Sequence, residues 1–334
     1  MIPRVSVLMP VYNCEAYIRE SVESILSQTF TNFEFLIIDD YSQDGTYEYL
    51  QTLTDPRIKL IRKPVNSGYA KSLNMGLDMA RGEYIARMDG DDIALPERFA
   101  KQVTFMDQHL GVVVAGTCYK VLGTDAVVQM PLSFEAAKMV ALMQVPVAHP
   151  TVFMRRSVLV KNQLRYDEKL EPTEDYDLWT RLMENGRIEN LPDVLLLYRR
   201  HSEQESITKL NRLIEAAVSI RERQLNKLLN FAHKPYDVLF AIAVLTKQAI
   251  PVSAGSLKLL RQLLTDMYES NSSTKVYDEH LLYQYLRNTW VFYIVQFNNP
   301  QLKDAGMLLQ MVGNNVTRMG LVFYLRSFKK MFKV

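Results

Sequence analysis

Three clusters of acidic residues are the part of this 334-residue chain whose types and spacing could do chemistry. They are Asp39-Asp40, Asp89-Gly90-Asp91-Asp92 and Glu174-Asp175-Tyr176-Asp177. Three carboxylates within four residues repel one another, and a divalent cation would offset that repulsion. Mg²⁺ and Mn²⁺ take oxygen ligands and complete their coordination with water and phosphate oxygens. Gly90 would let the backbone bend so that Asp89 and Asp91 reach the same side.

Each cluster also has a purely structural explanation. Residues 90–92 could form a solvated turn ahead of a helix that begins near Pro96. Thr173 could cap the next helix, whose dipole favours acidic residues in its first turn without any catalysis. Asp39-Asp40, followed by Ser42 and Gly45, could be a tight polar turn. The residues alone leave these alternatives open.

Alternating short strands and helices must position these clusters. Apolar runs predict strands at residues 5–9, 33–38, 58–62, 83–88 and 112–122, and helical spacing predicts helices at 15–28, 46–53, 69–80 and about 96–108. This alternation predicts an α/β layer with largely parallel strands. Ligands of such sheets bind beyond the carboxyl ends of the strands. We therefore expect the loops at Tyr12-Asn13, Asp39-Asp40 and 89–92 to meet in one crevice.

Composition and missing motifs exclude several classes of protein. Lys and Arg number 39 against 37 Asp and Glu, a net charge of +2, so no nucleic-acid partner is expected. Two cysteines, Cys14 and Cys118, are too few for a disulfide scaffold and favour a cytoplasmic chain. No run approaches the roughly 20 apolar residues of a membrane-spanning helix. Glycine-rich dinucleotide, P-loop and zinc-binding motifs are all missing.

The second half of the chain has a different pattern. From about Ser206 the strand-like runs largely vanish and apolar residues recur at helical spacing. We expect a catalytic domain at 1–205 and an all-helical region at 206–334. The aromatic stripe through Trp290 is expected in a core or in a homo-oligomer contact. Residues 320–334, basic on one side and aromatic on the other, would pack on the first domain or make a peripheral contact with an anionic membrane.

Fragments in a fixed order between Val5 and Ser206 carry a family resemblance. They are residues 10–13 (PVYN), 36–46 (LIIDDYSQDGT), 66–68 (NSG), 80–92 (ARGEYIARMDGDD), 149–151 (HPT) and 174–179 (EDYDLW). In order and spacing they resemble the family 2 glycosyltransferases of bacterial polysaccharide synthesis. The resemblance implies a GT-A fold, a nucleotide-sugar donor, a divalent metal and, usually, inversion at the anomeric carbon.

The resemblance also implies which residues bind the donor. Asp39 would accept the N–H of the uracil of a UDP-sugar, and Pro10 and Tyr12 would form the base-stacking wall. Further donor contacts are expected from Asn13, Asn66, Lys71, Arg87, Asp89, Gly90 and Arg199. Arg87 would support the phosphates, with an exposed strand arginine as the alternative.

Metal and acceptor residues follow from the same resemblance. Asp91 would bridge Mn²⁺ or Mg²⁺ to the diphosphate, with Asp89 and His201 as further ligands. Asp175 would be the base that activates the acceptor hydroxyl, and Glu174 would contact the acceptor. His149 would lie on the acceptor side, or it is a satisfied core histidine.

These expectations combine into an inverting, metal-dependent glycosyltransferase. It would pass a sugar from a UDP-sugar to a glycan or a lipid-diphosphate-linked glycan at the inner face of the cell membrane. One alternative is a sugar-1-phosphate nucleotidyltransferase, which is disfavoured because the glycine-rich, basic loop that binds a triphosphate is absent after Val11. The other is a non-catalytic glycan-binding protein that kept the fold.

Overall fold

The computed structural model describes residues 2–201, 210–250 and 253–298 of the chain. The chain divides into two compact units, residues 1–217 and 218–334. The expected domain boundary near Ser206 and the basic segment 320–334 both lie outside the described residues.

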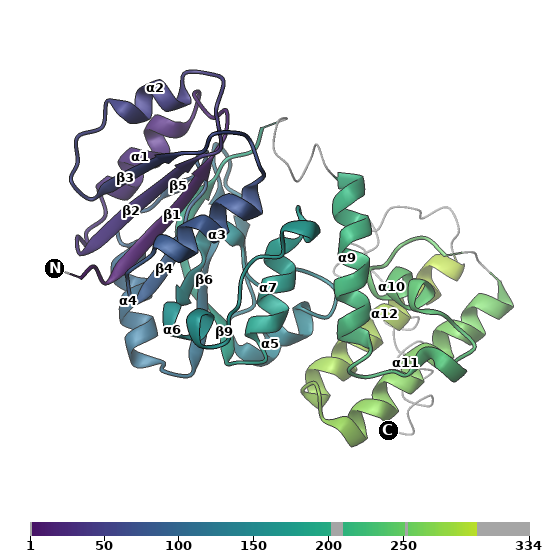
Figure 1. The fold of residues 1–334 in the computed structure, drawn as a ribbon. Helices are drawn as coiled ribbons and strands as arrows, with labels where there is room; N and C mark the ends of the chain where they lie inside the picture. The colour runs from purple at the N-terminus through teal and green to yellow at the C-terminus, as the bar shows by residue number, and fades with distance from the viewer. Residues whose placement is uncertain (1, 202–209, 251–252, 299–334) are drawn as a thin grey trace. The chain divides into compact units, whose positions relative to one another are not determined.

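A mixed sheet forms the centre of the first unit (Figure 1). Its strands are β1 (Val5–Val11), β2 (Phe33–Asp39), β3 (Ile58–Arg62), β4 (Tyr84–Arg87), β5 (Ile93–Ala94), β6 (Val112–Val121), β7 (Val127–Val128), β8 (Phe153–Arg155) and β9 (Arg187–Tyr198). Their order is β3-β2-β1-β4-β8-β6-β9-β5, with β7 beside β6. Strands β1 to β4 pair in parallel, as predicted.

The other half of the sheet corrects the prediction of largely parallel strands. β8 runs antiparallel to β4 and β6, β7 antiparallel to β6, and β5 antiparallel to β9, whereas β6 and β9 pair in parallel. The β6–β7 connection shows the physical reason, because residues 122–126 are too few for the crossover that a parallel pair needs.

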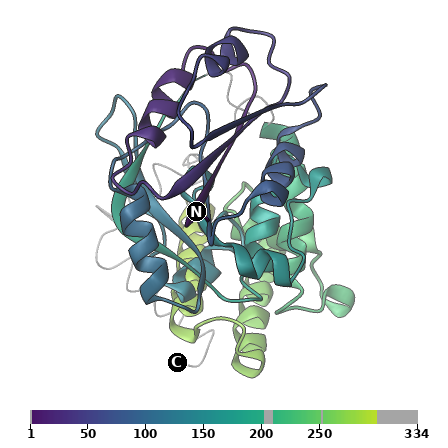
Figure 2. The ribbon, with the colours of Figure 1, turned by 60° about the vertical axis from the view of Figure 1, so that its left-hand side comes forward.

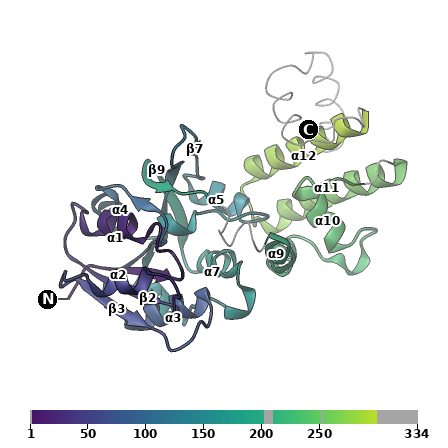
Figure 3. The ribbon, with the colours of Figure 1, turned by 90° about the horizontal axis from the view of Figure 1, so that it is seen from above.

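Helices cover both faces of this sheet (Figures 2 and 3). They are α1 (Ile18–Leu26), α2 (Thr46–Gln51), α3 (Tyr69–Met79), α4 (Arg98–Gln108), α5 (Phe134–Val140), α6 (Arg156–Lys161) and α7 (Glu174–Leu182), with single 3-10 turns at η1 (His149–Thr151) and η2 (Glu168–Leu170). Alternate side chains of β1 point to opposite faces. Val7 and Met9 pack with α1 and α4, whereas Leu8 packs with α3 and α7.

The second unit is helical in its described part. Its elements are α9 (Leu210–Leu225), which contains the unit boundary, then η3 (Phe231–His233), α10 (Val238–Leu245), α11 (Ala254–Thr274) and α12 (Glu279–Asn298). Inside it, the hydroxyl of Tyr236 donates to Asp266 at 2.6 Å, and Lys234 pairs with the same carboxylate at 2.9 Å. Among the described residues, no helix is long and apolar enough to cross a membrane. The predicted helical second half is confirmed.

The carboxyl ends of three parallel strands bring the acidic loops together. β1 and β2 are paired so that Val11 lies beside Asp39, and the backbone N–H of Asp40 donates to the carbonyl of Val11 at 2.8 Å. On the other side of β1, Met88 N–H donates to Leu8 at 3.0 Å. The loops after β1, β2 and β4 therefore lie at one edge of the sheet, as the sequence predicted.

Candidate active site

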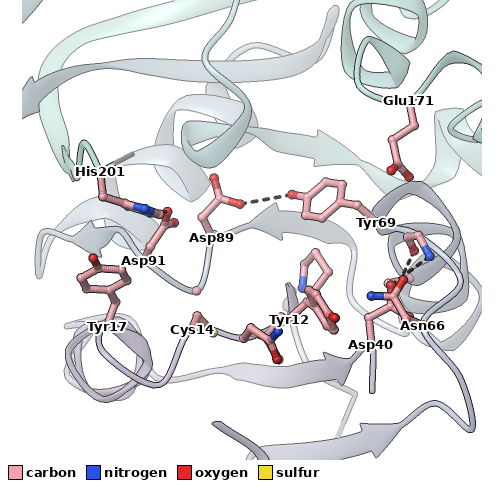
Figure 4. A pocket seen from close by; sticks show the side chains of 16 residues that line it. Tyr12, Cys14, Tyr17, Asp40, Asn66, Tyr69, Asp89, Asp91, Glu171 and His201 are labelled. Carbon is pink, nitrogen blue, oxygen red and sulfur yellow. Dashed lines mark hydrogen bonds and ion pairs between the residues drawn. The ribbon is translucent and has the colours of Figure 1, made fainter. Parts of the chain in front are cut away.

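A cavity of about 440 Å³ opens at this edge (Figure 4). It is lined by Pro10, Val11, Tyr12, Asn13, Cys14, Tyr17, Asp40, Asn66, Gly68, Tyr69, Ser72, Asp89, Gly90, Asp91, Glu171 and His201. Eight residues predicted from the sequence are among them, namely Pro10, Tyr12, Asn13, Asn66, Asp89, Gly90, Asp91 and His201. The structure thus brings most of the predicted donor and metal residues to one cavity.

The acidic trio Asp89, Asp91 and Asp92 forms one end of the site. One carboxylate oxygen from each of the three lies within 4.8 Å of the others. Asp92 is fully buried, and among the described residues its Oδ2 has no hydrogen-bond partner. Burial, together with the charges of Asp89 and Asp91, raises the pKa of Asp92 well above its ordinary value. An all-oxygen cluster with an orphaned buried oxygen fits a hard divalent cation.

Gly90 allows the trio to pack closely against β1. A Cβ atom at this position would lie 3.0 Å from Cys14 Sγ and 3.1 Å from Val11 Cγ1. These are tighter than ordinary carbon contacts, so a side chain here would push the loop away from the strand. Glycine is needed at this position for close approach rather than for a special backbone angle.

Residues after β9 close over Asp91. His201 Nε2 lies 2.9 Å from Asp91 Oδ2, which brings two of the residues predicted as metal ligands together. Arg199 Nε donates to the Asp91 carbonyl at 2.8 Å, and its backbone N–H donates to Asp92 Oδ1 at 2.9 Å. Arg199 was predicted to contact the donor, but it does not line the cavity. Its hydrogen bonds instead hold the segment after β9 against Asp91 and Asp92.

Arg87 also differs from its prediction as a phosphate ligand or an exposed strand residue. It is buried beneath the cavity, forms an ion pair with Asp89, and lies 5.3 Å below the ring centroid of Tyr69. The Tyr69 hydroxyl donates to Asp89 Oδ1 at 3.2 Å. Arg87 therefore neutralises Asp89 from inside the protein and does not contact the cavity.

Asp39 turns away from the cavity, contrary to its predicted contact with the base. Its side chain is fully buried, accepts the backbone N–H of Ser42 at 3.2 Å, and pairs with Arg62 at 3.3 Å. This arrangement is the polar turn that the sequence left open as an alternative. Asp39 is the last residue of β2, and its side chain follows the alternation of the strand.

Asp40, the next residue, lines the cavity at the end opposite the acidic trio. Its carboxylate accepts the backbone N–H groups of Ser67 and Gly68, each at 2.9 Å, and pairs with the buried Lys63 at 2.6 Å. Lys71, predicted to contact the donor, is exposed on α3 and does not line the cavity. The buried lysine at this end of the cavity is Lys63, which no motif pointed out.

Asp175 lies in the first turn of α7, next to the buried Glu174. Burial raises the pKa of Asp175 to about 6, although the backbone N–H of Tyr176, which donates to Asp175 Oδ1 at 2.6 Å, and the charge of Arg87 oppose the rise. Neither carboxylate lines the 440 Å³ cavity. A carboxylate whose pKa is raised in this way can accept a proton near neutral pH.

His149 is an aromatic-cluster residue. Its ring lies 6.0 Å from Tyr69, 5.5 Å from Tyr166 and 5.6 Å from Trp179, and its Nε2 is 3.0 Å from the Tyr166 hydroxyl. Burial, with the nearby charge of Arg87, lowers the pKa of His149 well below its ordinary value. Of the two alternatives for His149, the structure favours a neutral histidine in the core over a contact with the acceptor.

Sequence reasoning missed several cavity residues. Glu171 accepts the backbone N–H of Ala70 at 3.2 Å, and a Cβ at Gly68 would lie 2.9 Å from its carboxylate. Tyr17, which immediately precedes α1, packs its ring against that of His201, with the centroids 4.8 Å apart. These contacts join residues far apart in the chain, so no local motif could have indicated them.

Comparison with known proteins agrees with this geometry. The model of glycosyl transferase family 2 matches residues 6–162. An uncharacterized glycosyltransferase of Haemophilus influenzae is 31% identical over 282 residues, which are 80% of this chain and 86% of that protein. The chain belongs to glycosyltransferase family 2. It is a glycosyltransferase, and the nucleotidyltransferase and binding-protein alternatives fall away.

Two further proteins resemble the enzyme. The Escherichia coli UDP-Glc:alpha-D-GlcNAc-diphosphoundecaprenol beta-1,3-glucosyltransferase WfaP is 32% identical, over 63% of this chain and 82% of WfaP. The crystal structure of S. aureus TarS 1-349 in complex with UDP-GlcNAc aligns with a TM-score of 0.56 and 21% identity, over 86% of this chain and 88% of TarS 1-349. The predicted GT-A fold with a helical C-terminal region is confirmed.

Proposed function

We propose that this glycosyltransferase moves a sugar from a UDP-sugar to a saccharide acceptor, with a divalent metal and with inversion at the anomeric carbon. The observation that carries the proposal is one cavity with Asp40 at one end and Asp91 and His201 at the other (Figure 4). A nucleoside diphosphate has a base at one end and phosphates at the other, so it complements both ends. WfaP is named for UDP-Glc and TarS was crystallised with UDP-GlcNAc, which favours uridine.

At the base end, Asp40 would accept the uracil N–H, the role first predicted for Asp39. Its carboxylate already receives two backbone N–H groups and the Lys63 ammonium, which hold it in place as an acceptor. Pro10 and Tyr12 would flank the base, with Asn13 and Asn66 beside it. Asp89 would lie near the ribose.

At the phosphate end, the acidic trio would hold the metal. Asp91 and Asp89 would supply carboxylate oxygens, with His201 as a further ligand. A bound Mn²⁺ or Mg²⁺ offsets the charge that develops on the departing diphosphate. The orphaned oxygen of the buried Asp92 supports this assignment, since an unpaired carboxylate oxygen in the interior is costly without a cation nearby.

Asp175 would act as the base. With its pKa at about 6, most Asp175 carboxylates are ionised at pH 7 yet remain basic enough to take a proton from the acceptor hydroxyl. Attack from the side opposite the leaving UDP would convert an α-linked donor into a β-linked product. Glu174, one residue away in the same helical turn, would contact the acceptor.

The proposed acceptor is a lipid-diphosphate-linked glycan of surface polysaccharide synthesis. WfaP, named for such an acceptor, is the relative that favours it. This acceptor would place the reaction at the inner membrane face. The predicted membrane contact of residues 320–334 stays a proposal, because these residues lie outside the described part of the chain.

A donor screen tests the function directly. UDP- and GDP-sugars are incubated with a lipid-diphosphate glycan, with Mn²⁺ or with EDTA, and nucleotide release and the product's anomeric form are measured. We expect release from a UDP-sugar that EDTA abolishes, and a β-linked product. Full activity in EDTA would contradict the metal assignment, release from GDP-sugars alone would contradict the uridine assignment, and an α-linked product would contradict inversion.

Variants locate the chemistry within the protein. Asp91→Asn should remove the response to Mn²⁺, and Asp175→Asn should lower kcat about 10²- to 10⁴-fold, as expected for loss of a general base. Asp125→Asn is the matched control, because Asp125 is fully solvent-exposed in the turn between β6 and β7. Wild-type kcat in the Asp175 variant would show that another group is the base.

A further inference from the structure

Residues 199–201, which we call the strap, follow β9 and cross the acidic trio. His201 Nε2 is 2.9 Å from Asp91 Oδ2, and Arg199 Nε donates to the Asp91 carbonyl at 2.8 Å. Both ends of the strap therefore contact Asp91: His201 contacts its side chain, and Arg199 contacts its backbone carbonyl. The position of Asp91 depends on where the strap is held.

Tyr17 contacts both ends of the strap. Its ring centroid lies 4.8 Å from that of the His201 imidazole, with the ring planes inclined by 33°, and 4.9 Å from the guanidinium carbon of Arg199. Figure 4 shows the Tyr17 ring beside His201 and Asp91 at the edge of the cavity. An aromatic ring attracts a guanidinium through its quadrupole and packs with a second ring. Tyr17 thus supports the two side chains that hold Asp91.

A second link between the strap and α1 is weaker. Arg199 also pairs with Glu20 at 2.5 Å, but the Glu20 side chain is 58% exposed. Exposed ion pairs contribute little because water and salt screen them. The half-buried Tyr17 ring is screened less, so it is the stronger of these two contacts to α1.

We propose that Tyr17 is a positioning residue of the metal site, which keeps His201 and Asp91 at the geometry that binds the divalent cation. This inference rests on the proposed metal site. Tyr17 itself supplies no metal ligand, so its effect must pass through the strap. Shortening or removing the ring would leave all the proposed ligands present but less well ordered, and the cation would bind more weakly.

Direct Mn²⁺ binding tests the inference without any turnover. Mn²⁺ is titrated into each protein in the absence of donor, and the free ion is measured by its electron paramagnetic resonance signal. We expect Tyr17→Leu to weaken Mn²⁺ binding about fivefold, the size expected for an arene–cation contact plus ring packing. Tyr17→Phe, which keeps the ring, should bind Mn²⁺ as the wild type does. Wild-type affinity in the Leu variant would overturn the inference.

Tyr49→Leu is the matched control variant. Tyr49 also packs against an arginine of α1, since the Arg19 guanidinium carbon lies 4.4 Å from its ring centroid, but it does not line the cavity. Its replacement should lower the melting temperature without changing Mn²⁺ affinity. Equal weakening in the Tyr17 and Tyr49 variants would show a general loss of structure and overturn the positioning role.

A double variant shows whether Tyr17 acts through the strap. If it does, Tyr17→Leu combined with His201→Ala should weaken Mn²⁺ binding by less than the sum of the two single losses, because the ring then has only Arg199 left to support, whereas fully additive losses would overturn the inference. In turnover, the Tyr17→Leu variant should need about fivefold more Mn²⁺ for half-maximal rate yet reach nearly the wild-type kcat at saturation. Asp91→Asn separates the two proposals, because unchanged Mn²⁺ binding in that variant would refute the metal site itself.

Discussion

Asp40→Asn would leave Lys63 as a buried ammonium without its carboxylate partner. The side chains of Lys63 and Asp40 are 3% and 6% exposed, and their charged atoms are 2.6 Å apart. Removing one member of such a pair costs about 3–5 kcal/mol. Lys63 keeps its hydrogen bond to Ser72 Oγ at 2.9 Å. We therefore expect the lower value, about 3 kcal/mol, which lowers the melting temperature of a unit of this size by about 6–12 °C.

Adding Lys63→Met to this variant separates stability from donor binding. With both charges gone, the free energy of unfolding should return to within about 1 kcal/mol of the wild-type value. UDP affinity should not return, because the carboxylate that accepts the uracil N–H is still missing. A lost charge-assisted hydrogen bond costs about 1.5–3 kcal/mol, which corresponds to about 10- to 150-fold in affinity.

Thermal melting followed by circular dichroism measures the first effect, and calorimetric titration of UDP in the presence of Mn²⁺ measures the second. Asp39→Asn is the matched control, because it makes the same change one residue away at a side chain that faces Ser42 and Arg62. It should lower stability but keep UDP affinity. If Asp39→Asn abolished UDP binding while the double variant at Asp40 and Lys63 retained it, the assignment of Asp40 would be wrong. An Asp40→Asn protein that melted like the wild type would refute the buried-pair reasoning.

Two other predictions concern the pH dependence of activity and of stability. Asp175 must be ionised to act as a base, and burial raises its pKa to about 6. We therefore expect kcat/KM to fall about tenfold per pH unit below pH 6. A value of kcat/KM that did not change between pH 5 and 7 would contradict this role. Burial would raise the pKa of Glu34, but hydrogen bonds from Lys59, Ser6 and Arg81 outweigh it and lower the pKa to about 2. Glu34→Gln should therefore cost about 2 kcal/mol of stability at pH 7, and the difference should vanish as pH falls from about 5 towards 2 in acid-unfolding curves.

Much of the fold follows from local pattern. β3 occupies the residues predicted for it, and α3 and β6 each end one residue earlier than predicted. Apolar alternation and glycine positions act over a few residues, which is why a sequence reveals them. The pairing of β6 with β8 on one side and with β9 on the other was not predictable in this way, because it joins segments that lie far apart in the chain.

Adjacent residues of one motif posed a different problem. Asp39 and Asp40 have the same side chain, and only the end of β2 decides which of them faces the cavity. A strand sends successive side chains to opposite sides. The resemblance indicated Asp39, whereas Asp40 is the member of the pair that lines the cavity. The Lys63 side chain that pairs with Asp40 comes from the segment directly after β3.

The acidic trio shows how the structure makes three identical residues unequal. Asp89 is paired with Arg87 from beneath, so its charge is largely offset before any cation arrives. Asp91 Oδ2 lies 2.9 Å from His201 Nε2, so its neighbour is an imidazole that is itself a proposed metal ligand. Asp92 is fully buried, and one of its carboxylate oxygens finds no hydrogen-bond partner in the part of the chain that the structure describes. A cation at this site would therefore find the charge of Asp89 already offset by Arg87, Asp91 beside His201, and an oxygen of Asp92 that still lacks a partner among the described residues. We expect a bound cation to stabilise the ionised form of Asp92 more than that of Asp89 or Asp91. Asp91 is the residue of the trio that contacts the side chains of Arg199 and His201.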